Sequence, residues 1–101
     1  MSKKSYSEQL KDPRWQKRRL EIMKKNDFSC QECEETDKTL HIHHGTYLRD
    51  KSLWEYPDKL LHCLCEDCHQ RLQVEFEKLT FYLGTLSGPE ITEINYNLEI
   101  L

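Results

Sequence analysis

The chain has 101 residues, of which 37% are hydrophobic and 33% charged, and its formal net charge is −3. This length fits one domain with a thin apolar core, and such domains are often held together by a disulfide or a metal ion. No apolar run follows the basic start, and none is long enough to span a bilayer. We therefore expect a cytoplasmic protein with no membrane partner.

The basic residues gather near the N-terminus. Residues 1–25 hold nine Lys/Arg and three Asp/Glu, whereas residues 26–101 hold six and fifteen. A local excess of this kind can mark a surface that binds nucleic-acid phosphates, although a solvated helix surface explains it equally well. Asp12-Pro13 is typical of a helix start, since Asp caps free N–H groups and Pro suits the first turn. Apolar residues at helical spacing then predict a helix over about residues 13–26.

Two Cys-x-x-Cys pairs, Cys30/Cys33 and Cys65/Cys68, supply four thiolates. Four sulfur ligands are what a tetrahedral structural zinc ion takes, and a reducing compartment favours metal over disulfide. The gap between the pairs exceeds the usual 15–20 residues or so, and a hairpin with a long loop can absorb it. Redox-active pairs are the alternative, but neither pair lies in a βαβ setting. Cys63 is predicted to be a buried residue that binds no metal.

The middle and the end of the chain contain three further predicted elements. Period-two alternation predicts a strand over residues 39–43, an apolar run predicts a second hairpin strand over 60–64, and helical spacing predicts a helix over 69–83 that ends at Gly84. Residues 45–59 are predicted to be a loop, and the alternating tail after Pro89 indicates no definite structure.

Three histidines occupy notable positions. His43 and His44 are adjacent at the end of the first strand, so their side chains leave in different directions. His69 directly follows Cys68, and a hairpin folded back on the helix would bring it to His43. We expect a second metal site there, with the His44 imidazole beside it. Imidazole can accept a proton from water, and a divalent metal stabilises charge on phosphate oxygens. Each histidine taken alone is more often structural.

These residues belong to a larger pattern: Leu40-His-Ile-His43-His44, Trp54-Glu-Tyr-Pro57 and Leu64-Cys65-Glu-Asp-Cys68-His69, preceded by Tyr6–Leu10, Asp12-Pro-Arg-Trp15 and Lys17-Arg-Arg19. The pattern covers roughly residues 6–73 and resembles the HNH endonucleases, in particular small bacterial and phage members with two zinc knuckles. The resemblance implies a small α+β, zinc-stabilised ββα-metal domain with an N-terminal basic helix and a longer C-terminal helix. We expect one domain over residues 1–101, with its core at about 28–85 and a tail at 86–101.

The resemblance also implies an activity. His44 takes the place of the general base, and His43 and His69 take the places of ligands to a catalytic Mg²⁺, Mn²⁺ or Ni²⁺ ion. The chain would hydrolyse DNA phosphodiester bonds; a single site in a monomer would nick one strand, whereas a symmetric dimer could cut both. It departs from the family at two places. Leu60 stands where the middle Asn belongs, so Asp58 or a backbone carbonyl would orient His44. Gln73 stands where some relatives have a further histidine ligand.

Five cations are predicted to contact nucleic-acid phosphates: Arg14, Lys17, Arg18, Arg49 and Lys51. No base-reading helix is evident, so we expect double-stranded DNA to be bound with weak sequence preference. The chain would act as a monomer or a homodimer. Two other readings stay open: a non-catalytic zinc module that binds nucleic acid or protein, and a redox or metal-sensing protein with a labile zinc.

Overall fold

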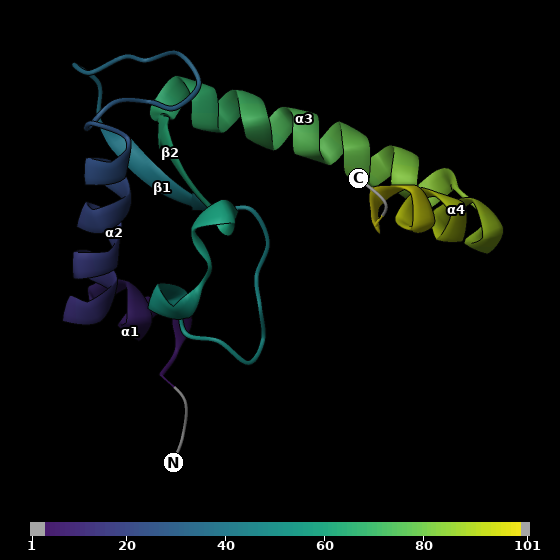
Figure 1. Cartoon of the computed structure of the whole chain (residues 1–101), viewed down its shortest axis with the longest axis horizontal. Coiled ribbons are helices and arrows are strands. Elements are labelled where there is room, and N and C mark those ends of the chain that lie inside the picture. The colour runs from purple at the N-terminus through teal and green to yellow at the C-terminus, as the bar shows by residue number, and fades with distance from the viewer. Residues whose placement is uncertain (1–3, 100–101) are drawn as a thin grey trace. The chain divides into compact units, whose positions relative to one another are not determined.

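The computed structural model describes residues 4–99 (Figure 1). The chain divides into two compact units, one up to His69 and one from Gln70 onward. The first unit contains two helices and a two-stranded antiparallel sheet, and the second is helical. The predicted α+β class is therefore confirmed at this coarse level, whereas the HNH fold itself stays a prediction.

Two short helices begin the first unit. Helix α1 (Tyr6–Lys11) starts at a capping box in which Ser5 and Glu8 bond each other's backbone N–H groups. Helix α2 (Pro13–Lys25) confirms the helix predicted over 13–26, and the Asp12 carboxylate caps it by accepting the Arg14 N–H at 2.8 Å.

The sheet is a hairpin of β1 (Leu40–His44) and β2 (Leu61–Cys65), each shifted by one residue from its predicted range. Ile42 pairs with Cys63 and His43 with His62. Because successive strand residues face opposite sides, Ile42 and Cys63 share one face and the two histidines share the other.

The core lies on the Ile42 face of the hairpin. It joins α2, the hairpin and the segment between the strands, where the short helices η1 (Leu53–Glu55) and η2 (Asp58–Leu60) lie. Its buried members are Trp15, Ile22, Leu53, Tyr56, Leu61 and Cys63. Cys63 is fully buried and donates its S–H to the Ser29 carbonyl, which confirms that it is a core residue.

Helix α3 (Glu66–Thr85) follows β2 without a loop. It starts three residues before the predicted His69, since Glu66 and Asp67 place negative charge in the first turn, where the helix dipole favours it. Its end at Thr85 lies one residue beyond the predicted stop at Gly84.

The tail forms a helix, α4 (Gly88–Glu99), that the alternating sequence did not reveal. A local signal was present in Ser87-Gly-Pro-Glu90. Ser87 and Glu90 bond each other's backbone N–H groups as a capping box, and Pro89 lies in the first turn. Over residues 4–99 no helix combines the length and the apolar character needed to cross a bilayer.

Candidate metal centre and histidine face

Cys30, Cys33, Cys65 and Cys68 form one cluster, called here the cysteine cluster. Their four Sγ atoms lie within 4.8 Å of one another, and those of Cys33 and Cys65 are 3.8 Å apart. A tetrahedral zinc ion with Zn–S bonds of about 2.3 Å holds its sulfurs about 3.8 Å apart. All five cysteines are free thiols, so no disulfide competes for these sulfurs. The cluster has the ligand number, type and spacing of a closed metal site.

Two tight turns aim these sulfurs at one point. In the first, the Glu34 N–H donates to the Cys30 carbonyl at 2.8 Å, and Glu34 adopts a left-handed φ of 65°. In the second, Cys65 ends β2 and Cys68 lies in the first turn of α3. The two-residue gap within each pair therefore matches the turn that contains it.

The thiols differ in acidity. Burial alone would raise the pKa of Cys30, but N–H groups of Cys33, Cys65 and Glu32 outweigh it and lower that pKa to about 6. Burial and the neighbouring thiols raise the pKa of Cys68 to about 12. Thiolates this close repel one another, so the four cannot all ionise unless a cation neutralises them.

His43 and His69, called here the histidine pair, meet on the face of the hairpin opposite the core. His43 Nδ1 lies 3.1 Å from His69 Nε2, and the ring centroids are 4.9 Å apart. Two imidazole nitrogens bound to one ion at about 2.1 Å are about 3 Å apart, so the pair fits two sites on one metal. Burial lowers the pKa of His43 most, and the charges of the nearby His69, His62 and His44 lower it further. The lowered pKa favours the neutral form that binds metal.

His44 points the other way, into the core, and is only 5% exposed. Its ring centroid lies 4.9 Å from those of Trp15 and Tyr56 and 5.5 Å from that of Tyr47. The two adjacent side chains thus leave the strand in different directions, as the sequence predicted.

The state of the His44 ring follows from its partners. Burial lowers the pKa of His44, and a hydrogen bond with the Leu53 backbone partly opposes this. Its Nε2 is buried without a hydrogen-bond partner. The bond to Leu53 raises the pKa, as a donated ring N–H does, so Nδ1 carries the proton and Nε2 keeps its lone pair.

Asp58 does not orient His44 as predicted. Its carboxylate accepts from Arg18 and, at 2.9 Å, from Lys25, because η2 turns it toward α2. The backbone of Leu53 takes the orienting role instead, which was the other predicted possibility. Gln73 is exposed on α3 and belongs to the second unit, and its role as a ligand stays a prediction.

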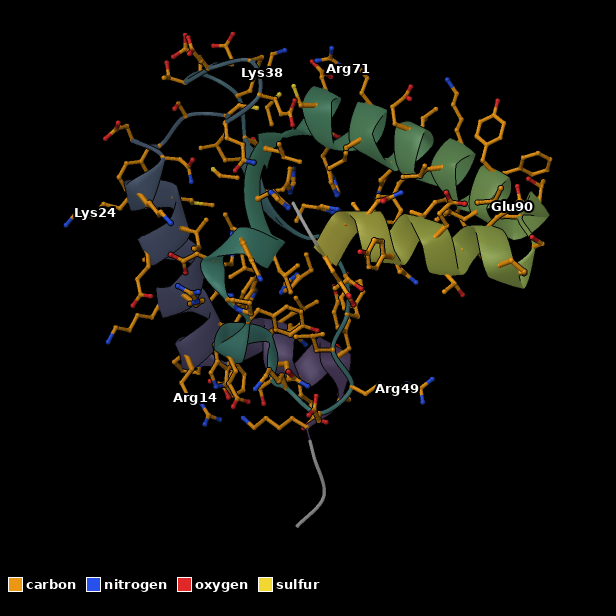
Figure 2. All side chains as sticks on the ribbon, turned by 45° about the vertical axis from the view of Figure 1, so that its right-hand side comes forward. Arg14, Lys24, Lys38, Arg49, Arg71 and Glu90 are labelled. Atoms are coloured by element: carbon orange, nitrogen blue, oxygen red, sulfur yellow. The ribbon has the colours of Figure 1, made fainter. Side chains whose placement is uncertain are left out.

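The predicted phosphate contacts divide into two groups. Arg14 bonds the Asp12 carboxylate at 2.9 Å and lies over the Trp54 ring, and Arg18 is 17% exposed and donates to the Tyr56 carbonyl at 2.8 Å. Arg18 is therefore held by groups of the fold, whereas the side chain of Arg14 is 61% exposed and bonds a residue two positions away. Their contacts with phosphate stay predictions. Lys17 is exposed on α2, and Arg49 and Lys51 are exposed in the loop after β1; Figure 2 shows Arg49 pointing away from the ribbon.

Sequence reasoning missed His41 and His62. The His41 ring stacks against His69 at 5.9 Å, and the His62 ring lies 6.3 Å from that of His43. Four of the five histidines thus gather on one side. The signal was present, because His41 and His43 alternate on one strand and the paired strand contains His62.

Comparisons of the chain with protein-family models, with curated proteins and with solved structures found no match.

Proposed function

We propose that this chain is a divalent-metal-dependent endonuclease that hydrolyses phosphodiester bonds in DNA, with a structural zinc ion in the cysteine cluster. The observation that carries the proposal is the 3.1 Å approach of the His43 and His69 nitrogens, one residue from a histidine whose Nε2 has no partner. A buried polar atom without a partner is rare in folded proteins and often belongs to a functional site.

The zinc assignment rests on the cysteine cluster. The Sγ–Sγ distance of 3.8 Å matches a tetrahedral Zn–S₄ site. Zinc binding to such sites is worth on the order of 10 kcal/mol at neutral pH, which is comparable with the whole stability of a small domain. The cluster joins the turn after α2, the end of β2 and the start of α3. It therefore brings His69 to the hairpin.

Each histidine has one role in the proposed reaction. His43 and His69 hold a catalytic divalent ion, which stabilises negative charge on phosphate oxygens when it is bound. His44 acts as general base through Nε2 and takes a proton from the attacking water. Its Nδ1–H, bonded to Leu53, keeps the lone pair on Nε2. The exposed side chains of Lys17, Arg49 and Lys51 contact neighbouring phosphates.

A plasmid-relaxation assay tests the proposal. The protein is first freed of all metals except zinc, and its content of one zinc ion per chain is measured. Mg²⁺, Mn²⁺ or Ni²⁺ is then added to separate samples. We expect supercoiled DNA to become open-circle, and His44→Ala and the less disruptive His44→Gln to cut at least about a hundredfold slower with zinc and fold retained. His69→Ala should also lose activity. Relaxation by His44→Gln at the wild-type rate would refute the assignment of the base.

A non-catalytic zinc module that binds nucleic acid or protein is the second candidate. The burial of His44 in a cage of aromatic rings favours it, because such a ring can serve packing alone. No relaxation with any of the three metals, in folded protein holding one zinc, would favour this candidate.

A further inference from the structure

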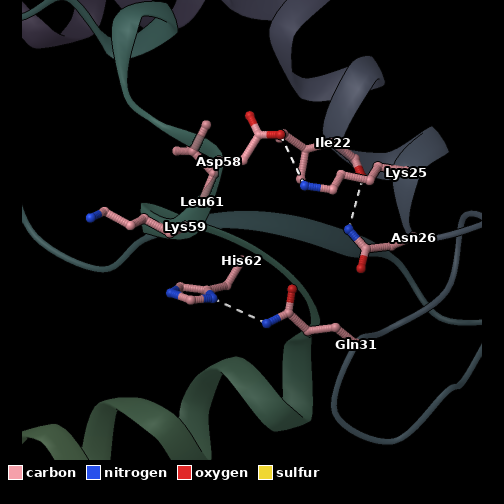
Figure 3. Close-up of a pocket in the computed structure, with 8 residues that line it drawn as sticks. All are labelled: Ile22, Lys25, Asn26, Gln31, Asp58, Lys59, Leu61 and His62. Atoms are coloured by element: carbon pink, nitrogen blue, oxygen red, sulfur yellow. Dashed lines mark hydrogen bonds and ion pairs between the residues drawn. The ribbon is translucent and has the colours of Figure 1, made fainter. Parts of the chain in front are cut away.

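A pocket of about 210 Å³ lies beside β2 in the first unit (Figure 3). Ile22 and Leu61 lie at its floor, and both belong to the buried core, so they leave little apolar surface open. The other lining side chains are polar or charged. Lys25 and Asn26 come from the end of α2 on one side, and Lys59 and His62 come from η2 and β2 on the other. Drug-sized ligands fill about 300–1,000 Å³, so this pocket suits one smaller unit.

The charges around the pocket favour an anion. Two lysines, Lys25 and Lys59, and one carboxylate, Asp58, line the pocket, so its lining carries one net positive charge. The Asp58 carboxylate pairs with Lys25 at 2.9 Å. The unbalanced charge is that of Lys59, which is exposed, and its ammonium group makes no hydrogen bond or ion pair within residues 4–99. A phosphate group entering here would meet a net positive wall and an ammonium group available to donate to it.

His62 supplies a donor of fixed direction. Gln31 accepts the Cys63 N–H with Oε1 at 3.0 Å, so its Nε2 faces His62 Nδ1, also at 3.0 Å. An amide nitrogen only donates, so His62 Nδ1 accepts and its Nε2 carries the proton. A Cβ on Gly45 would lie 3.3 Å from that Nε2, so glycine leaves the ring its space.

From these features we propose that the pocket binds one phosphate-bearing nucleotide unit of a nucleic-acid strand. The phosphate is held by Lys59 and by His62 Nε2–H, and Gln31 is the positioning residue for His62. The His62 ring lies 6.3 Å from that of His43, so the bound unit neighbours the histidine pair. The assignment rests on the proposed nucleic-acid substrate. It goes beyond that function by giving the strand a second point of attachment.

The test is a titration of zinc-loaded, ¹⁵N-labelled full-length protein followed by NMR. The probes are the dinucleotide pTpT and, separately, inorganic phosphate, without added divalent metal so that nothing is cleaved. We expect pTpT to shift the side-chain amides of Asn26 and Gln31 and the backbone amides of Lys59 and His62. Lys59→Ala should weaken binding about tenfold, as loss of a charge-assisted bond does. Lys24→Ala, exposed on α2 but outside the pocket, should leave it unchanged.

A second variant tests Gln31. Gln31→Glu keeps an acceptor for the Cys63 N–H but removes the donor to His62. The His62 ring should therefore change tautomer, which its ¹⁵N chemical shifts report. The variant should also bind pTpT more weakly. Shifts that are absent or lie elsewhere, or equal effects of Lys24→Ala and Lys59→Ala, would overturn the proposal. If inorganic phosphate bound as tightly as pTpT, the pocket would recognise phosphate alone, and the claim that its ligand is part of a nucleic-acid strand would be contradicted. Binding is measured without cleavage, so an inactive protein with an occupied pocket would refute only the nuclease.

Discussion

His43 Nδ1 lies 3.1 Å from His69 Nε2, while the side chain of His44, the next residue, packs 4.9 Å from the Trp15 ring on the opposite face of the hairpin. One strand therefore presents a potential metal ligand to α3 and a potential base to the core. The position of His69 depends on the start of α3, where Cys65 and Cys68 of the cysteine cluster lie, whereas that of His44 depends on the core.

Zinc removal gives the first prediction. Cys68→Ser should abolish stoichiometric zinc binding, and the first unit should lose cooperative unfolding, because the lost binding energy is about as large as the stability of a small domain. Metal content by mass spectrometry and thermal unfolding by circular dichroism measure the two effects. Cys63→Ala is the control: it should keep one zinc and be destabilised only by the smaller cost of a core cavity. Full zinc content in Cys68→Ser would remove that residue from the site.

Tyr47 gives the second prediction. It is 61% exposed and stacks on the nearly buried His44 at 5.5 Å, so it covers the imidazole from the solvent side. If His44 is the base, Tyr47 must move to admit water and phosphate. Tyr47→Ala should therefore keep cleavage within about tenfold of wild type or raise it, whereas a residue essential to proton transfer costs at least a hundredfold or so. Tyr47→Phe, which keeps the ring, should match wild type. A loss in Tyr47→Ala as large as that in His44→Gln would contradict a covering role.

Two neighbouring cations on α2 should behave differently. Lys17→Ala should weaken DNA binding and reduce the slope of log K against log salt by about 1, with no change in thermal stability. Arg18→Ala should instead destabilise the fold by about 1–3 kcal/mol, because it leaves the Tyr56 carbonyl without its charged donor. Fluorescence anisotropy at several salt concentrations and thermal melts separate the two effects. If Arg18→Ala weakened DNA binding without loss of thermal stability, Arg18 would have to leave its internal partners to bind DNA.

Asp12 gives a pH-dependent prediction. Hydrogen bonds from the Arg14 and Lys4 side chains hold the pKa of this carboxyl well below its ordinary value of 3.8. A carboxyl with a depressed folded-state pKa stabilises the fold above its unfolded pKa, and the effect is lost as pH falls through the folded value. Asp12→Asn should therefore lower the melting temperature by roughly 4–8 °C, and by the same amount at pH 7 and pH 5. Asp50→Asn, in the exposed loop, serves as control and should change little. The difference should shrink as pH falls below about 4, and a difference that stays the same down to pH 2.5 or so would mean that the folded carboxyl keeps its ordinary pKa.

Several features followed from local sequence. The Asp12-Pro13 start predicted α2, and the two Cys-x-x-Cys pairs predicted four sulfurs at one point. Both rest on interactions within a few residues, namely a cap and a tight turn, and so can be read along the chain. The start of helix α4 could also be predicted from the capping box of Ser87 and Glu90. The alternation of apolar and acidic residues after it is not typical of a helix.

Contacts between distant residues were decided only by the tertiary structure. Arg18 and Asp58 are 40 positions apart, and the ion pair between these two predicted site residues forms only in the folded chain. The histidine face and the pocket depend on the register that pairs His43 with His62, which brings residues of separate strands together. The sequence by itself determined which side chains could bind metal, because ligand type and turn spacing are local properties. Only the folded chain decided which imidazoles meet, which is buried and which cations stay exposed, because burial and ion pairing depend on what packs against each group.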